Sequence, residues 1–205
     1  MVMKKIFLFL FLLFSAQIVN AQVSTVITDL SGRAQIVVEV KRDGWVVLDL
    51  YGKIIDIVGL DGFTEFYSDF FDHEAGKIKS IDGVKFQYYS DFYDYESGKI
   101  KQIGSISFKY YSDFYAYESG KLKSIGNVDF KYHSDFYDYQ KGKIKSIGGV
   151  PFEYNSDFYE HQKGLIKSIG SNKYTYSNSW SSRRGRIESG MRKFKANNIE
   201  FIVKF

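Results

Sequence analysis

Cysteine is absent from this 205-residue chain, and proline occurs once, as Pro151. Without cysteine the chain can form no disulfide bond, no thiolate zinc site and no cysteine nucleophile, so other interactions must hold its fold together. Helix-forming Ala and Leu are sparse after the first 21 residues, whereas Tyr, Phe, Ile, Val and Gly are common. This composition favours strands and turns.

Long hydrophobic runs are also missing, apart from one at the N-terminus. Lys4 and Lys5 precede an apolar run over residues 6–19, and Val19-Asn20-Ala21 places small residues at the spacing that a signal peptidase needs. This pattern predicts a signal peptide over residues 1–21, because the run is too short to span a bilayer as an anchor. We therefore expect an exported protein located in the periplasm, at the cell surface or outside the cell.

A repeat dominates the rest of the sequence. The tripeptide Ser-Asp-Phe begins at residues 68, 90, 112, 134 and 156, in steps of 22 residues. A Gly-Lys-Ile block follows it each time with small changes. These matches indicate five units, at 62–83, 84–105, 106–127, 128–149 and 150–171. Because terminal repeats must face water, we interpret 22–61 as N-terminal capping hairpins and 172–205 as a degenerate repeat with a C-terminal capping strand.

Each unit has the pattern of a β-hairpin. Val84, Phe86 and Tyr88 alternate with polar residues, which is typical of a half-buried strand. A turn at 96–98 and a short second strand at 99–103 follow. One hairpin buries too little to fold alone, so neighbouring units must supply its core. The predicted fold is all-β: an array of antiparallel hairpins with a 22-residue period, forming either an extended twisted meander sheet or a β-solenoid.

Three columns of identical apolar residues are predicted to form the core. Identity at a fixed position in every unit suggests that the position lies inside. The columns are Phe70, Phe92, Phe114, Phe136, Phe158 and then Trp180; Phe86, Phe108, Phe130, Phe152 and Tyr174; and Ile81, Ile103, Ile125, Ile147 and Ile169.

The segment 93–100, Tyr-Asp-Tyr-Glu-Ser-Gly-Lys-Ile, resembles the Tyr-Asp-x-x-Gly-Arg-Leu core of the YD repeats of bacterial secreted proteins. The unit is also similar in length and hairpin pattern to MORN-type repeats. The resemblance covers the five units. It departs from YD repeats by one extra residue before the glycine, and from MORN repeats by lacking their glycine spacing. Both families imply antiparallel hairpin arrays, and neither implies a catalytic site.

Two aromatic columns tolerate His or Asn, which suggests that they are partly exposed. A row of exposed rings could stack on sugar rings or on an apolar patch of a partner, and the alternative is that the rings only pair across strands. We predict a partner-binding face for an unknown protein or polysaccharide. Its candidate residues are Tyr89, Tyr95, Tyr111, Tyr117, Tyr139 and His161.

Catalysis needs a unique constellation of groups, whereas this repeat supplies copies. The histidines at 73, 133 and 161 occupy positions where other units carry Tyr. We expect no enzymatic activity, no cofactor and no metal site. The aspartates at 69, 91, 113, 135 and 157 could ligate Ca²⁺, but a single fixed carboxylate per unit favours a role in turns or ion pairs.

The C-terminal part is basic. Residues 165–205 carry nine basic side chains against Glu188 and Glu200. Arg183, Arg184 and Arg186 are candidate contacts for an anionic partner, and the alternative is a solvated loop before the final strand. We do not expect nucleic acid as the partner. Exposed sheet edges at the ends of the array would favour self-association.

The sequence therefore predicts a secreted or cell-envelope repeat protein that binds or scaffolds without catalysis. The alternative is a small outer-membrane β-barrel, because the alternating segment 199–205 ends in Phe. The second strand of each unit is short and rich in lysine, whereas barrel strands need about 9–11 residues with an apolar outer face.

Overall fold

The computed structural model describes residues 23–178 and 185–205, which contain strands and turns but no helix. The signal peptide prediction and Trp180 lie outside the described residues. No helix that could cross a membrane occurs in the described part of the chain. The strands of the units and their extension are β5 (Thr64–Phe66), β6 (Ile78–Ile81), β7 (Val84–Tyr88), β8 (Ile100–Ile103), β9 (Ile106–Tyr110), β10 (Leu122–Ile125), β11 (Val128–Tyr132), β12 (Ile144–Ile147), β13 (Val150–Tyr154), β14 (Ile166–Ile169), β15 (Asn172–Lys173), β16 (Thr175–Tyr176) and β17 (Ile187–Ser189). The remaining strands are β1 (Val23–Asp29), β2 (Ala34–Lys41), β3 (Gly44–Leu48), β4 (Ile54–Val58), β18 (Lys193–Ala196) and β19 (Ile199–Lys204).

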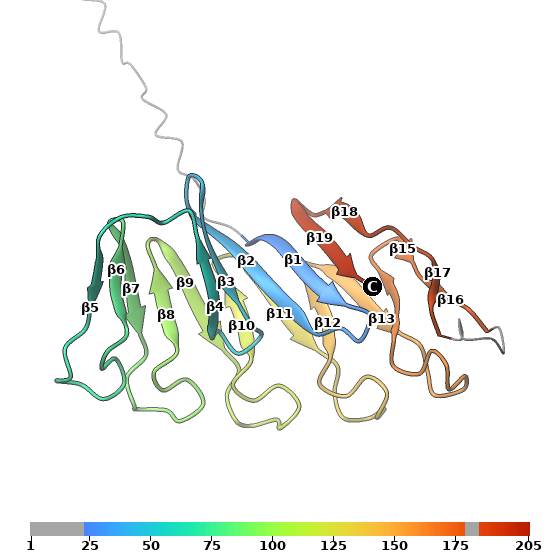
Figure 1. Ribbon diagram of the computed structural model, residues 1–205. Helices are drawn as coiled ribbons and strands as arrows, with labels where there is room; N and C mark the ends of the chain where they lie inside the picture. Colours follow the sequence, from blue (N-terminus) through green and yellow to red (C-terminus); the bar gives the residue numbers. More distant parts are fainter. Residues whose placement is uncertain (1–22, 179–184) are drawn as a thin grey trace, which may run out of the picture.

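Strands β5 to β15 form one 11-stranded antiparallel meander, in which each strand pairs with its neighbours in the sequence. Tight turns connect the strands at one end of their length. Long loops connect them at the other end, where the loops protrude side by side (Figure 1). The sheet is open, so the predicted all-β hairpin meander is confirmed and the solenoid alternative is wrong.

Period-two alternation determines which face of the large sheet is buried. In β9, Ile106, Phe108 and Tyr110 are buried, whereas Ser107 and Lys109 are exposed. The same alternation recurs in β11 and β13. The predicted core columns that contain Phe86 and Ile81 are therefore confirmed.

The chain segments on either side of the units form a second sheet. Its order is β18-β19-β1-β2-β3-β4, and β19 pairs with β1 in parallel, so the first and last strands of the described chain lie side by side. This small sheet covers the inner face of the large sheet instead of extending the array at its ends (Figure 1). The predicted strand at the C-terminus is present as β19, and 22–61 contains hairpins, among them β2–β3.

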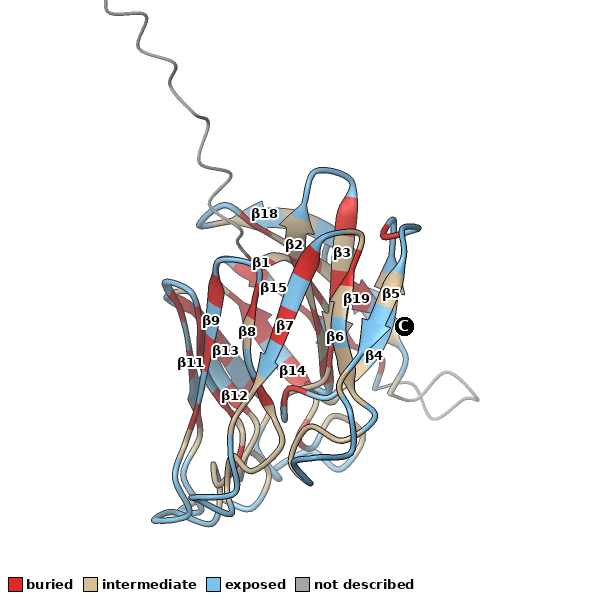
Figure 2. Ribbon diagram, turned by 90° about the vertical axis from the view of Figure 1, so that its left-hand side faces the viewer, coloured by how far each residue is buried: buried red, intermediate tan, exposed pale blue. Residues whose placement is uncertain are grey.

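The hydrophobic core lies between the two sheets, where the buried positions of both face each other (Figure 2). The ring of Phe201 from β19 packs against Phe152 from β13, with 6.0 Å between the ring centroids. At the rim, the Lys41 amine forms an ion pair with Asp82 at 2.7 Å, joining the β2–β3 turn to the β6–β7 turn. Burial between two sheets thus stabilises a chain that has no disulfide.

Candidate functional site

The first predicted core column is exposed, and this part of the core prediction was wrong. Phe92 is 79% exposed, and the equivalent phenylalanines are exposed to a similar degree. They lie in the protruding loops, beyond the ends of the strands (Figure 2). Each is followed by a second ring that is about half exposed. We call these paired rings the aromatic ridge: Phe70, Phe92, Phe114, Phe136 and Phe158, followed by Phe71, Tyr93, Tyr115, Tyr137 and Tyr159.

Hydrogen bonds within each loop hold the ridge residues in place. In the second unit the carbonyl of Tyr93 accepts from the amides of Glu96 and Ser97, at 3.2 and 2.9 Å. The amide of Gly98 donates to the carbonyl of Tyr89 at the base of the loop. The Ser97 hydroxyl also donates to the Asp91 carboxylate at 2.6 Å. The loop is therefore a tight, repeated turn structure that presents its rings in a fixed arrangement.

Three rings of each central loop form a small stack. Phe92 meets Tyr93 edge-on, with ring centroids 4.6 Å apart, and Tyr93 stacks on Tyr95 at 5.5 Å. The same arrangement recurs around Tyr115. Tyr95 is partly buried and packs against the core. The exposed phenylalanine thus sits at the tip of a stack whose base is anchored.

The predicted partner-binding residues lie mostly at the base of the loops. Tyr89 and Tyr111 are half-buried, and their hydroxyls donate to the carbonyls of Phe108 and Phe130 in the next unit, at 2.8 and 3.0 Å. His133 takes the equivalent position, and its Nε2 lies 3.2 Å from the Phe152 carbonyl oxygen. Tolerance of His at this position is therefore explained by a shared hydrogen bond between units.

The other candidates divide between the loops and the C-terminal part. Tyr117, Tyr139 and His161 are half-buried beneath the ridge, as Tyr95 is. Arg186 is exposed, and its backbone carbonyl accepts from the amide of Ser177 at 2.8 Å. Arg183 and Arg184 lie outside the described residues. The structure thus separates the basic candidates from the aromatic ones.

A lysine links each loop to the next. The Lys99 amine donates to the Gly120 carbonyl at 2.5 Å and lies 5.0 Å from the ring centroid of Tyr110. Lys121 makes the equivalent contacts with Gly142 and Tyr132. Burial lowers the pKa of these amines, but each gains a carbonyl acceptor and an aromatic face. Neighbouring loops are thereby fixed relative to each other.

The ridge phenylalanines could have been recognised as exposed from the sequence. The period-two alternation of a unit stops at Tyr88, and Phe92 follows the turn-forming pair Ser90-Asp91. A residue at that position belongs to a loop, and loops lie on the surface. The core prediction for this column rested on the identity of its residues, although identical residues can equally bind a shared ligand.

The described residues contain no group of three or more His, Asp or Glu side chains that could hold a metal ion. In the second unit, the Asp91 carboxylate serves the loop by accepting from Ser97. This geometry offers aromatic rings and carboxylates at the surface of the loops.

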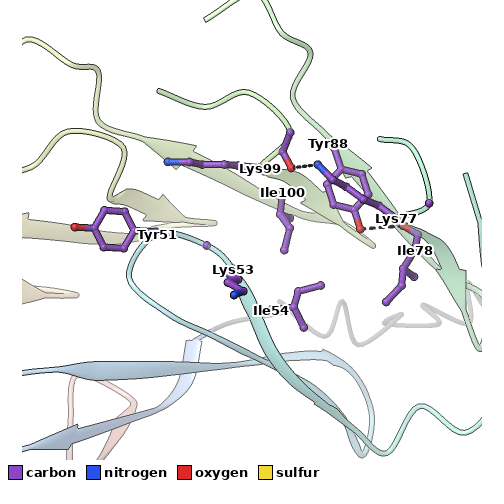
Figure 3. A pocket seen from close by; sticks show the side chains of 11 residues that line it. Tyr51, Lys53, Ile54, Lys77, Ile78, Tyr88, Lys99 and Ile100 are labelled. Atoms are coloured by element: carbon purple, nitrogen blue, oxygen red, sulfur yellow. Dashed lines mark hydrogen bonds between the residues drawn. The ribbon is translucent and has the colours of Figure 1, made fainter. Parts of the chain in front are cut away.

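A cavity of about 460 Å³ opens between β4 and the first two units. Ile78 and Ile100 of the large sheet point toward β4, where Ile54 lies (Figure 3). Tyr88 forms part of the wall, and its hydroxyl donates to the Ile78 carbonyl at 3.0 Å. Burial raises the pKa of Tyr88 to about 12. The cavity is therefore mainly apolar and lies apart from the ridge.

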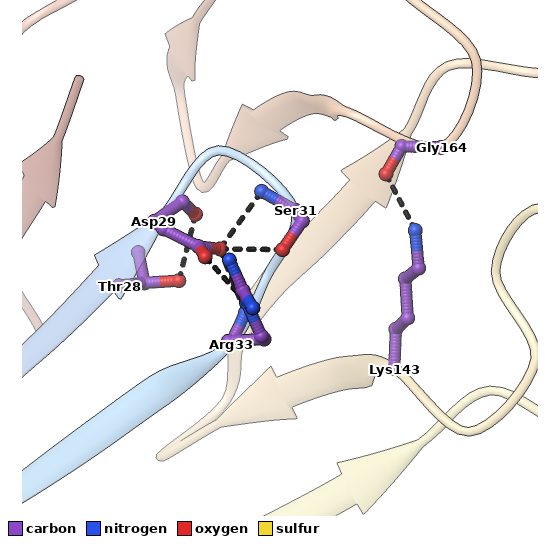
Figure 4. A network of polar contacts seen from close by, with 6 residues as sticks. All are labelled: Thr28, Asp29, Ser31, Arg33, Lys143 and Gly164. Atoms are coloured by element: carbon purple, nitrogen blue, oxygen red, sulfur yellow. Dashed lines mark hydrogen bonds and ion pairs between the residues drawn. The ribbon is translucent and has the colours of Figure 1, made fainter.

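Two turns of the small sheet dock on the large sheet in the same way. Their sequences, Asp-Leu-Ser-Gly-Arg at 29–33 and Asp-Leu-Tyr-Gly-Lys at 49–53, share Asp, Leu and Gly. In the first turn, Asp29 accepts hydrogen bonds from Ser31 and Arg33, which lower its pKa although burial alone would raise it (Figure 4). The Leu30 carbonyl accepts from the amide of Ile166 at 2.8 Å.

The second turn repeats this contact two units earlier in the array. The Leu50 carbonyl accepts from the amide of Leu122, again at 2.8 Å. Gly52 lies against the ring of Tyr110, as Gly32 lies against Tyr154. The two hairpins that receive the turns, β9–β10 and β13–β14, each have a register shift next to the receiving amide. A β-bulge leaves a backbone group outside the ladder, which makes it available to the other sheet.

Comparison with protein-family models, curated proteins and solved structures finds no match to this chain. The resemblance to YD and MORN repeats stays a prediction.

Proposed function

We propose that this chain is an exported, non-enzymatic binding protein whose aromatic ridge holds an extended polysaccharide at the cell envelope. The carrying observation is that five phenylalanines are identical in all units although each is about four-fifths exposed. Other water-facing loop positions vary or carry polar residues: positions 72, 94, 116, 138 and 160 hold Asp, Asp, Ala, Asp and Glu, and the identical pair before each phenylalanine is Ser-Asp. Retention of an apolar ring there is best explained by a ligand.

The spacing of the ridge supports a polymeric ligand. Each unit contributes two strands, so successive rings are separated by roughly 10 Å, given strand spacings of about 4.8 Å. Rings offer flat faces to pyranose rings, and nearby exposed carboxylates such as Asp91 and Asp94 can accept hydrogen bonds from hydroxyl groups. Five equivalent sites on one sheet can also bind the same polymer at once, which raises the overall affinity above that of a single site. The predicted signal peptide is consistent with a location where such polymers occur.

The test is a glycan array and polysaccharide pull-down with the mature chain and a ridge variant, Phe92→Ser with Phe114→Ser and Phe136→Ser. We expect the variant to lose binding with an unchanged melting temperature, because the rings are exposed. Phe63→Ser is the matched control, since Phe63 is 82% exposed but lies outside the ridge. Failure of the mature chain to bind any polysaccharide, or equal binding by the ridge variant, would contradict the proposal.

A further inference from the structure

A second surface lies at the open end of the two-sheet core, away from the aromatic ridge. We propose that the groove between β4 and strands β6 to β8 binds a β-hairpin of a partner protein. One strand of this hairpin would pair with the free edge of β4 and fill the 460 Å³ cavity, and its turn would reach Phe66 and Ile78. This proposal does not depend on polysaccharide binding.

The two docked turns define where the hairpin turn would lie. Their receiving amides belong to Leu122 and Ile166, which are two 22-residue units apart. Their contacting rings, Tyr110 and Tyr154, have the same separation. Two units before Leu122 and Tyr110 the chain has Ile78 and Phe66. The large sheet therefore has a third equivalent docking position, which lies beyond the edge of the small sheet.

That next position is uncovered. Phe66 is 61% exposed, whereas Tyr110 and Tyr154 are each 5% exposed beneath the docked turns. Ile78 is only half-buried, whereas the equivalent Leu122 and Ile166 are fully buried. A large sheet with apolar residues on its inner face gains stability when a second layer covers it. The missing layer at this end is one hairpin wide.

The edge of the small sheet faces the same gap. Strand β4 pairs only with β3 among the described strands, so its other edge is free. Its sequence is Ile-Ile-Asp-Ile-Val, in which Asp56 is the single charge and accepts from the Ile57 amide at 2.9 Å. A register shift against β3 lies between Ile54 and Asp56. Proteins usually protect an edge with charges, proline or a bulge, and β4 has one charge and one irregularity beside four apolar residues, which leave an apolar edge for a further strand. Addition of a strand to such an edge is an established mode of peptide recognition.

The occupant is a partner and not a second copy of this chain. Both Asp-Leu-x-Gly turns of a copy are already docked within that copy, so it could supply one only by opening its own core. The partner hairpin needs apolar residues along one face for the cavity and a small residue at its turn. The second requirement follows from Gly32 and Gly52, where a Cβ atom would collide with the facing tyrosine ring.

The probe is a synthetic peptide with the sequence of residues 23–41, closed by a disulfide between added terminal cysteines. Binding to the full mature chain is measured by fluorescence anisotropy. We expect saturable binding that weakens at least roughly tenfold when the peptide carries Gly32→Val, as for the loss of an interface hot spot. Absence of saturable binding, or equal binding of both peptides, would overturn the proposal.

Substitutions in the chain locate the site. Ile54→Lys places a charge in the cavity, whereas Ile55→Lys on the opposite face of the same strand is the matched control. We expect loss of peptide binding in the first variant only. Ile78→Lys, on the facing wall, provides a second test if Ile54→Lys does not fold. Equal loss with Ile55→Lys would overturn the assignment. Concentration-dependent dimers of the unsubstituted chain that Ile54→Lys abolishes would show a second copy in the groove, which also refutes a partner hairpin.

Discussion

At the scale of single residues, the tyrosines at the bases of the loops donate hydrogen bonds to the neighbouring unit. Tyr67, Tyr89 and Tyr111 each donate a hydroxyl to the carbonyl of a buried phenylalanine one unit further along the chain. That carbonyl belongs to a strand whose side chain fills the core. The tyrosine thus ties the loop of one unit to the core strand of the next.

Tyr111→Phe tests this contribution. Removal of the hydroxyl leaves the Phe130 carbonyl without its 3.0 Å donor, and we expect a loss of about 0.5–1.5 kcal/mol in the free energy of unfolding. Tyr115→Phe is the control, because the half-exposed Tyr115 contributes its ring to the ridge stack. Urea denaturation measures both. Equal destabilisation by the two substitutions would show that the hydrogen bond between units is not the cause.

His133 makes this contact dependent on pH. Burial lowers the pKa of His133 below 6.5, because the partly buried site favours the neutral ring. The folded protein therefore has its full stability above pH 6.5, where His133 is neutral in both the folded and the unfolded state. It loses stability as the pH falls from there through the folded-state pKa of His133, because the unfolded state takes up the proton first. We expect His133→Tyr to match the original chain above pH 6.5 and to be more stable below it. Unfolding free energies on both sides of that pH provide the measurement, and a constant difference would contradict this explanation.

At the scale of secondary-structure elements, the sequence predicted strands better than loops. Alternation in Val84, Phe86 and Tyr88 is caused by burial of one sheet face, so it predicts both the strand and its inward residues. The loop that contains Phe92 has no such period, because its conformation depends on local turns and on contacts with the neighbouring loop. Identity between copies was therefore the remaining signal, and it cannot distinguish a core position from a binding position.

The small sheet was beyond what the repeat could predict. Hairpins within 22–61 and a strand at the C-terminus were predicted, but the parallel pairing of β1 with β19 joins residues far apart in the chain. Such a contact depends on which face of the array needs cover, and local patterns carry no information about it. The two Asp-Leu-x-Gly turns were the sequence signal for it, because turns of the same sequence can make the same contact with two units of a repeated surface.

The docked turn gives a prediction about glycine. Gly52 has a φ of 78°, and a Cβ there would collide with the Tyr110 ring and hydroxyl. Gly76 has a φ of 65° but open space around it. Ala at either position carries a left-handed backbone cost of about 1–2 kcal/mol. We expect Gly52→Ala to cost about 1–3 kcal/mol more than Gly76→Ala, because of overpacking. Thermal unfolding of both variants checks this, and equal costs would mean that Tyr110 moves aside freely.

At the scale of the whole molecule, the two sheets must agree in spacing. The small sheet has a fixed distance between its two docked turns, set by the strands β2 and β3 between them. The large sheet receives these turns at Leu122 and Ile166, two units apart. The number of units between the two docking points is therefore constrained, whereas the number outside them is not. A repeat array usually tolerates loss of a unit, but here tolerance depends on which unit is lost.

Deletion of whole units tests this constraint. Removal of residues 128–149 brings the two docking amides one unit closer, so the small sheet can dock only one of its turns. Removal of 62–83 leaves both docking points intact, and the new junction is short, because the Phe63 carbonyl accepts from the Asp82 amide at the start of the array. We expect the second deletion to fold cooperatively with a modest loss of stability. In the first, we expect amide hydrogen exchange to show lost protection in β1 to β4. Equal protection of those strands in both deletions would refute a spacing match between the sheets.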